Sequence, residues 1–314
     1  MNKQSTINAS PTIRDWVMFA LMIFLGGGAF SIIQVAVQTI PPIVVATGRL
    51  WFGAIALYIV MRLAGRQLPD VTITQNTGKR INPQWLWLMA IAFFGYVLPF
   101  NIFPWAQQSV PSGLAGIFMA FMPIWTIILA HYFGGEHLSP QKMIGVGLGI
   151  AGMIVLIGPD VIVSVASSSL TAQAALLGAT FLYAIGAILT KRAPEMPPRV
   201  LAAGALLCAT VMSAPLLLFA EVRFSDWSVA GMLSVIALGV GPTAAATLIL
   251  IALIKRVGAG FMALSNYLTP IWAVLLGAIL FRERLEITAF IALALSLAGV
   301  AVAQYQRNQK TPTD

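Results

Sequence analysis

Charged side chains are scarce in this sequence. Only 9% of the 314 residues are charged, and only ten are Asp or Glu, whereas a soluble domain carries about 25% charged residues. So few charges do not cover the surface of a soluble fold of this size, which excludes the soluble globular classes. Because 59% of the residues are hydrophobic, we expect the chain to have a lipid bilayer as its solvent.

The residues that build most catalytic and metal sites are also rare. The chain has one cysteine, Cys208, and two histidines, so no disulfide forms within it. It contains no HExxH motif, phosphate-binding loop, zinc spacing or credible serine–histidine–acid set. We therefore expect no enzyme, no catalytic residue, no metal and no cofactor. No Asp or Glu lies mid-way along an apolar run, so the runs lack the embedded carboxylate that commonly binds a proton or a cation at membrane depth.

One glycine motif needs a separate interpretation. Gly147, Gly149 and Gly152 match the dinucleotide pattern GxGxxG, but they lie in an apolar run with no preceding strand. Gly145 and Gly149 form a small-xxx-small face, which allows two membrane helices to approach closely. The pattern therefore predicts helix packing.

Ten apolar runs of 17 to 28 residues fill most of the chain. About 20 residues are needed to cross about 30 Å of hydrocarbon, and helices satisfy their own backbone hydrogen bonds. The sequence thus predicts an all-α integral membrane protein with ten transmembrane helices, and segment 66–83 is expected to be a mobile surface loop. The runs are 16–37, 43–63, 84–105, 112–132, 141–157, 172–190, 200–220, 227–254, 259–281 and 286–304.

Two parts of the chain share one register. A shift of 147 positions places Pro270-Ile271-Trp272 on Pro123-Ile124-Trp125. The same shift aligns further pairs without a gap: Gly260 with Gly113, Leu276 with Leu129, Glu283 with Glu136, and Gly299 with Gly152. We interpret this as a duplicated five-helix unit, with one repeat at 12–160 and the other at 170–306. Internal repeats are typical of membrane transporters.

The basic residues predict the orientation. Fourteen of the 18 Lys and Arg lie in loops on one side and three on the other, so the positive-inside rule places both termini in the cytoplasm. A five-helix unit begins and ends on opposite faces, so its copy is inverted. The net charge of +8 is spread between apolar runs, and we therefore expect no nucleic-acid partner.

Polar side chains within the runs are the candidate solute ligands. Such residues are costly in lipid and commonly face a cavity, although each is also explained by a hydrogen bond between helices. The candidates are Gln34, Tyr96, Asn101, Tyr183, Ser265, Asn266 and Tyr267. Asn266 and Tyr183 are the first choices among them.

Arg49 is the only basic residue well inside a run, about 10 Å from the helix end that begins near Pro42. We favour a structural role, in which it snorkels outward or binds loop carbonyls. The alternative is contact with the anionic group of a solute.

The paired prolines and glutamates have two interpretations each. Pro123 and Pro270 each free a carbonyl four residues back, which predicts two helix hinges beside a central site, although membrane helices also tolerate proline without any function. Glu136 and Glu283 end two runs. We expect them to close a turn or pair with a nearby basic residue, with a transport role as the alternative.

Segments 109–139 and 255–286, which contain the Pro-Ile-Trp motifs, resemble the two EamA-type repeats of the drug/metabolite transporter superfamily. The shared features are a small-residue-rich entry, a mid-helix proline, a terminal glutamate and a glycine-rich last helix. Arg49 also matches the family's usual arginine. The sequence departs from the family at Gly26 and Tyr183, where tryptophan is often found, and at Arg282, where glycine commonly precedes the glutamate.

The resemblance implies a multi-pass carrier of the inner membrane, with a cavity between its halves. We therefore predict a secondary transporter that moves a small metabolite, such as an amino acid, by alternating access, with export as the direction common among relatives. The alternatives are a drug efflux carrier of the same fold and a non-transporting membrane sensor or enzyme. The expected partners are a small-molecule solute and the lipid bilayer, for a monomer or homodimer.

Overall fold

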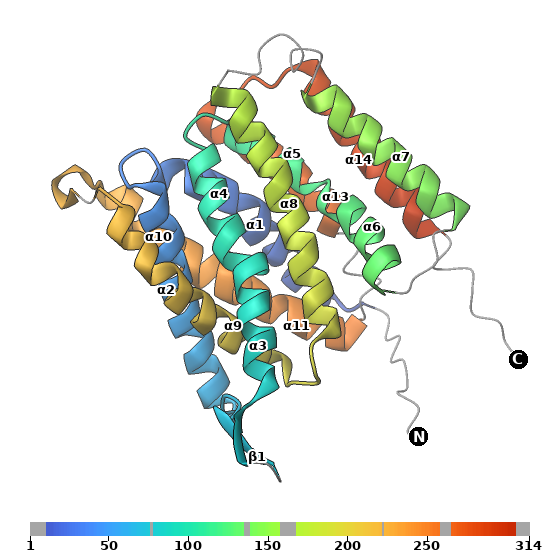
Figure 1. Ribbon diagram of the computed structural model, residues 1–314. Helices are drawn as coiled ribbons and strands as arrows, with labels where there is room; N and C mark the ends of the chain where they lie inside the picture. The colour runs from blue at the N-terminus through green and yellow to red at the C-terminus, as the bar shows by residue number, and fades with distance from the viewer. Residues whose placement is uncertain are drawn as a thin grey trace, which may run out of the picture.

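The computed structural model describes residues 11–75, 78–134, 139–157, 168–221, 223–257 and 265–305. These ranges form a bundle of helices (Figure 1). The first helix, α1 (Ile13–Ala36), begins at a capping box in which Thr12 and Asp15 satisfy each other's backbone N–H groups. The second, α2 (Pro42–Leu63), begins with Pro42, whose missing N–H has no partner to lose in a first helical turn.

Two of the predicted runs in the first half are not regular α-helices throughout. The elements follow in the order α3 (Pro83–Ala92), π-helix η1 (Phe93–Val97), α4 (Leu98–Ala106), α5 (Ser112–Met119), α6 (Met122–Gly134) and α7 (Pro140–Ile157). The first three are continuous, with a wider turn at η1. By contrast, the chain leaves the helical path at Ala120 and Phe121, which separate α5 from α6.

The segment 66–83, predicted as a mobile surface loop, contains a β-hairpin that the sequence analysis did not predict. Strands β1 (Thr72–Gln75) and β2 (Gly78–Ile81) form an antiparallel hairpin in which Thr72 pairs with Ile81. The β-branched residues of β1 favour an extended backbone. The hairpin projects from the end of the bundle at which α3 begins (Figure 1).

The second half has the same kinds of element. They are α8 (Ser168–Arg192), α9 (Pro198–Ser213), the 3₁₀ turns η3 (Ala214–Phe219) and η4 (Phe224–Asp226), α10 (Val229–Leu238), π-helix η5 (Gly239–Ala245), α11 (Ala246–Val257), α13 (Ser265–Phe281) and α14 (Ile287–Tyr305). Here too a π-helix joins two α-helices into one continuous span.

The described helices fit a multi-pass membrane protein. Seven helical spans are long and apolar enough to cross a bilayer, with mean hydropathy between 1.8 and 2.1, and three further apolar helices are shorter. Many large apolar side chains are exposed on the outside of the bundle, including Ile13, Leu63 and Ile279. An apolar outer surface is expected where lipid is the solvent. The prediction of a helical integral membrane protein is therefore confirmed.

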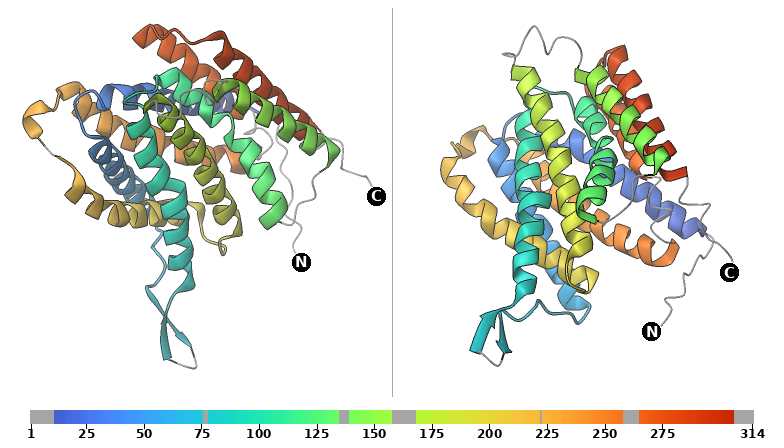
Figure 2. Two further views of the ribbon diagram at one scale, coloured as in Figure 1. Left: turned by 45° about the horizontal axis from the view of Figure 1, so that its top comes forward. Right: turned by 45° about the vertical axis from the view of Figure 1, so that its right-hand side comes forward.

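Helices α7 and α14 lie side by side along one edge of the bundle in all three views (Figures 1 and 2). Gly145 faces the carbonyl oxygen of Gly299, and a Cβ atom on either glycine would collide with the opposite backbone. A Cβ on Gly149 would lie 2.6 Å from Ile124 of α6. The glycines of α7 thus serve close packing, as predicted.

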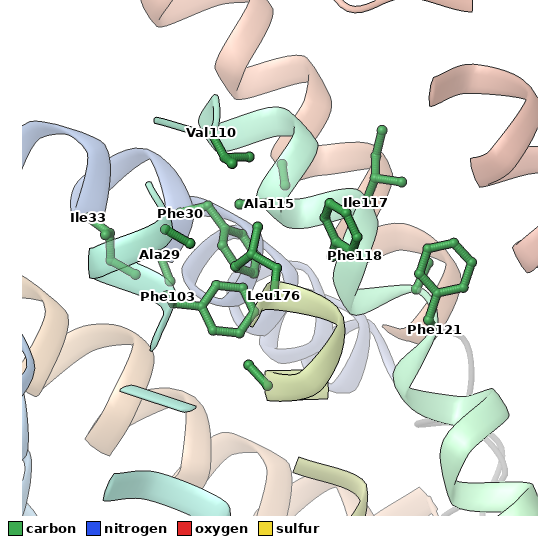
Figure 3. Close-up of a cluster of buried hydrophobic side chains, with 14 of the residues drawn as sticks. Ala29, Phe30, Ile33, Phe103, Val110, Ala115, Ile117, Phe118, Phe121 and Leu176 are labelled. Atoms are coloured by element: carbon green, nitrogen blue, oxygen red, sulfur yellow. The ribbon is translucent and has the colours of Figure 1, made fainter. Parts of the chain in front are cut away.

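The two halves of the chain are interleaved. Helices α1 and α5 both pack against α13, α2 packs against α9, and α6 packs against α8. Figure 3 shows the resulting apolar core, where Phe30 of α1, Phe103 of α4, Phe118 of α5 and Leu176 of α8 meet. An ion pair of 2.6 Å between Asp15 and Arg256 also ties the start of α1 to the end of α11.

Candidate functional site

Arg49 lies in α2 with only 8% of its surface exposed. Its Nε donates a hydrogen bond of 2.8 Å to Oγ1 of Thr243, and its guanidinium carbon lies 3.9 Å from the centre of the Phe100 ring. Both partners come from other segments, η5 and α4. Among the described residues its partners are a hydroxyl group and a ring, and no loop carbonyl, and the side chain stays inside the bundle. The structural role favoured from the sequence stays a prediction. The residue lies far enough into α2 for η5 and α4 to enclose its guanidinium group.

The π-helix η5 supplies the Thr243 hydroxyl. Thr243 accepts from Arg49 and donates 2.8 Å to the carbonyl oxygen of Leu238, five residues back. Pro242, which has no N–H, lies within this wider turn. The α2 backbone approaches closely because Gly53 faces the carbonyl of Gly239, where a Cβ atom would lie 3.2 Å from the oxygen. π-Helical turns within α-helices are frequent at functional sites.

An aromatic row leads from Arg49 through the bundle. Ring centres are separated by 5.6 Å between Tyr96 and Phe100, 6.4 Å between Phe100 and Tyr183, 5.9 Å between Tyr183 and Phe103, and 5.6 Å between Phe103 and Phe30. Tyr96 and Tyr183 both pack against Phe100, the ring over which the Arg49 guanidinium lies. The structure therefore brings together three residues singled out from the sequence, Arg49, Tyr96 and Tyr183. We call these three, with Phe100 and Thr243, the Arg49 cluster.

Sequence reasoning missed Phe100 and Thr243. Phe100 reads as an ordinary core residue, but Tyr96, Phe100 and Phe103 occur at spacings of four and three, which place them on one helix face. That spacing was the available signal. Thr243 follows Pro242, and no pattern in the sequence predicts that its hydroxyl faces α2.

Asn101 and Gln34 are each only half-buried and are not part of the Arg49 cluster. The Asn101 side chain donates 2.8 Å to the carbonyl oxygen of Val97 in its own span, so it neither bridges helices nor binds Arg49. Its Oδ1 atom and the Oε1 atom of Gln34 are buried without a hydrogen-bond partner among the described residues. Buried acceptors of this kind normally find a donor.

Ser265, Asn266 and Tyr267 form the first turn of α13. Ser265 and Asn266 are half-buried, and the side chain of Tyr267 lies outside the described residues. The recorded interactions of Arg49 involve none of the three. Their role as solute ligands stays a prediction.

The twin prolines occupy different backbone environments. Pro123 is the second residue of α6, directly after the break at Ala120 and Phe121, whereas Pro270 is buried inside the continuous helix α13. The hinge role of both stays a prediction, and only the first lies at a visible interruption.

Glu283 has a different partner from the one expected. Its Oε1 accepts 2.8 Å from the Ser112 N–H and 2.7 Å from the Ser112 hydroxyl, and its Oε2 accepts 2.8 Å from the Gly113 N–H. It thus caps α5, and among the residues that the structure describes no basic side chain pairs with it. Arg282 adopts a φ of 53°, a conformation that glycine adopts freely. Glu136 lies outside the described residues.

The best-formed pockets are lined by other residues than those of the Arg49 cluster. Two pockets of about 280 Å³ lie at helix ends, one around Trp227 and Glu221 and one around Arg66 and Glu195. Within the described part of the chain, no group of three His, Cys, Asp or Glu side chains is arranged to hold a metal ion.

Known proteins resemble the chain over 63% to 96% of its length. The uncharacterized inner membrane transporter YedA of Escherichia coli strain K12 is 25% identical over 289 residues, which cover 91% of this chain and 88% of YedA. The aromatic amino acid exporter YddG of Ancylobacter novellus is 26% identical over 200 residues, covering 63% of this chain and 69% of YddG. A solved crystal structure covering 96% of this chain and 99% of its own matches with a TM-score of 0.63 at 22% identity, which shows a shared fold alone.

The family assignment rests on two matched segments. Residues 14–158 and 170–304 each match the EamA-like transporter family, so the match covers both halves and almost every helix described above. Family and relatives indicate a transporter rather than an enzyme. The chain therefore belongs to the EamA-like transporter family of multi-pass membrane proteins.

Proposed function

We propose that this protein is a secondary carrier that moves a small organic solute bearing a carboxylate, such as an amino acid, by alternating access. The observation that carries the proposal is Arg49, a buried cation in a membrane span. Among the described residues it has no carboxylate partner, and its one recorded hydrogen bond uses Nε. An ionisable side chain at membrane depth marks a functional site by default, because burying an unpaired charge is costly.

The surroundings of Arg49 fit an anionic ligand. Thr243 and the Phe100 ring hold the guanidinium plane, so little side-chain freedom remains to be lost when a ligand binds. The two terminal nitrogens are then suited to a bidentate contact with a carboxylate. Tyr96 and Tyr183 stand beside the charge and offer hydroxyl groups and ring faces to the remainder of the solute.

The aromatic row favours an apolar or aromatic side chain on that solute. Phe103 and Tyr183 lie next to the charged end of the cluster, and aromatic rings attract one another beyond simple area burial. The relative YddG is described as an aromatic amino acid exporter. We extend amino-acid transport to this chain on these two grounds, with export as the proposed direction.

The proposed architecture is ten spans in two inverted repeats, at 12–160 and 170–306, with both termini cytoplasmic. The seven long spans and three shorter apolar helices support this number. The π-helices support the register, because a shift of 147 carries η1 into η5. The same shift aligns Trp125 with Trp272, and each of these rings contacts a phenylalanine from the other half. The ring centres are 5.4 Å apart between Trp125 and Phe181, and 5.7 Å apart between Trp272 and Phe24.

Transport by purified protein in liposomes tests the proposal. We expect saturable uptake of a labelled amino acid, and Arg49→Gln should lower it by about tenfold or more, because a hydrogen bond to a charged group is lost. Arg62→Gln is the matched control, since Arg62 is exposed at the end of the same helix. Flux that rises linearly with concentration would indicate a pore. A folded Arg49→Gln protein with unchanged uptake would refute the role of Arg49.

A further inference from the structure

We infer that Glu283 is the latch of a gate, holding the membrane face at which α5 begins and α13 ends in its closed state. This inference rests on the proposed alternating access but concerns a site distinct from the Arg49 cluster. The three hydrogen bonds of Glu283, each 2.7 or 2.8 Å long, join residues 170 or 171 positions apart. They connect the two halves of the chain directly.

Helix α5 depends on this contact because it has no cap of its own. The residue before its first turn is Pro111, and no side chain of that segment caps the helix. The first N–H groups of a helix lack partners within the helix, and a carboxylate is the favoured acceptor at that positive end. Glu283 supplies both oxygens. The contact is half-buried: the Ser112 side chain is fully buried, and Glu283 is partly exposed.

The seat for the carboxylate is formed by two glycines. A Cβ atom on Gly277 would overlap Oε2 of Glu283 and lie 3.0 Å from the Gly113 N–H, and a Cβ on Gly113 would lie 2.9 Å from the same oxygen. Arg282, at φ 53°, turns the chain after α13 so that Glu283 N–H reaches back to the carbonyl of Gly277 at 3.3 Å. The carboxylate is therefore aimed at α5 by the backbone.

Helix α5 is a short element between two interruptions of the helical path. It spans eight residues between the latch at Ser112 and the break at Ala120 and Phe121. Releasing Glu283 exposes two N–H groups, a hydroxyl and a carboxylate, and water hydrates all of them. A contact that exchanges protein partners for water in this way opens and closes reversibly, which a permanent apolar seam does not.

Cysteine labelling tests the latch. The reporter is Val274→Cys in a Cys208→Ala background, because Val274 is buried one turn deeper in α13 than Gly277. In the latched protein a membrane-impermeant maleimide should label it slowly. Glu283→Gln should raise the labelling rate about tenfold. The glutamine side chain has one NH₂ group in place of an acceptor oxygen, and this donor would face the N–H donors of α5. Gly277→Ala should raise it as well, by displacing an unchanged carboxylate.

Two controls separate a gate from general loosening. Glu286→Gln makes the same change at an exposed glutamate and should leave the labelling rate unchanged. The native Cys208, buried in α9, should stay unlabelled in Glu283→Gln with Val274 intact. Unchanged Val274→Cys labelling in folded Glu283→Gln protein overturns the proposal, and so does equal labelling of Cys208, which indicates unfolding.

The side of labelling is a further readout. Intact cells and inside-out vesicles should differ, with faster reaction from the face that carries Glu283; under the proposed orientation this is the outer face. Reaction from the inner face would correct the orientation and keep the latch. Absence of saturable uptake by the parent protein would refute the carrier while leaving the labelling result interpretable.

Discussion

The two Pro-Ile-Trp segments have the same residues and different structures. Around Pro123 the chain is broken into α5 and α6, whereas around Pro270 the helix α13 is continuous. The Trp125 indole donates 3.2 Å to Oγ1 of Thr180, while the indole nitrogen of Trp272 is buried without a partner among the described residues. The same Pro-Ile-Trp motif is thus found in two different backbone and hydrogen-bonding environments.

The neighbouring helix explains much of this difference. Trp272 packs on α1, where a Cβ atom on Gly27 would lie 2.9 Å from its ring and 2.8 Å from the Thr269 carbonyl. Trp125 packs on α8, which presents Phe181 and the hydroxyl of Thr180. Both tryptophans thus contact a phenylalanine, but the α1 contact also brings the Gly27 backbone close to α13, whereas the α8 contact adds a hydrogen bond to a polar side chain.

The largest expected effect comes from widening the α1 contact. Gly27→Leu should lower the free energy of unfolding by about 3 kcal/mol, because its side chain has no space beside Thr269 and Trp272. Thermal unfolding in detergent measures the change. Gly178→Leu in α8 is the matched control, since a Cβ there meets nothing within 4 Å. Equal losses in both variants would remove the proposed distinction between the two contacts.

The next largest effect is expected from replacing the prolines, which should change the free energy of unfolding by different amounts in the two segments. Pro270→Ala restores an N–H inside a continuous helix, and we expect it to raise the free energy of unfolding by about 2 kcal/mol. Pro123→Ala should change it by less than about 0.5 kcal/mol, because a second helical residue has no N–H partner to regain. The same unfolding assay compares them. A gain at Pro123 as large as at Pro270 would show that the break before α6 closes easily.

The smallest expected effect concerns the indoles. Trp125→Phe and Trp272→Phe lose the same ring area. Trp125→Phe also loses the hydrogen bond to Thr180, which should lower the free energy of unfolding by about 1 kcal/mol more. Trp272→Phe removes an N–H that has no recorded partner, so it should cost less. Thr180→Val measures the same bond from the other side. If the two tryptophan variants are equally destabilised, the hydrogen bond contributes nothing.

Much of the fold was accessible from the sequence because lipid imposes a simple rule. Runs of about 20 apolar residues must be helical, and the runs predicted at 16–37 and 43–63 correspond closely to α1 and α2. The close packing of Gly145 was predicted for the same reason, since small residues mark helix contacts. The hairpin at Thr72 was not predicted, because a polar connecting segment outside the lipid is free to form a strand or a loop.

The candidate site was only partly accessible. The sequence predicts a role for Arg49, Tyr96 and Tyr183 because polar groups in lipid are costly. The structure places all three around Phe100. The same rule also selected Asn101, which turns back onto its own helix. Cost alone says that a polar group needs a partner and does not say whether that partner is a solute or a carbonyl.

The sequence by itself determined the bilayer environment, the helical spans and the twin motifs, because hydropathy and register are properties of the chain alone. The tertiary structure decided that Arg49 meets Phe100 and Thr243, and that Glu283 caps α5. These contacts join residues 51, 194 and 171 positions apart in the sequence. Their distances depend on how whole helices cross, and no local pattern contains that information.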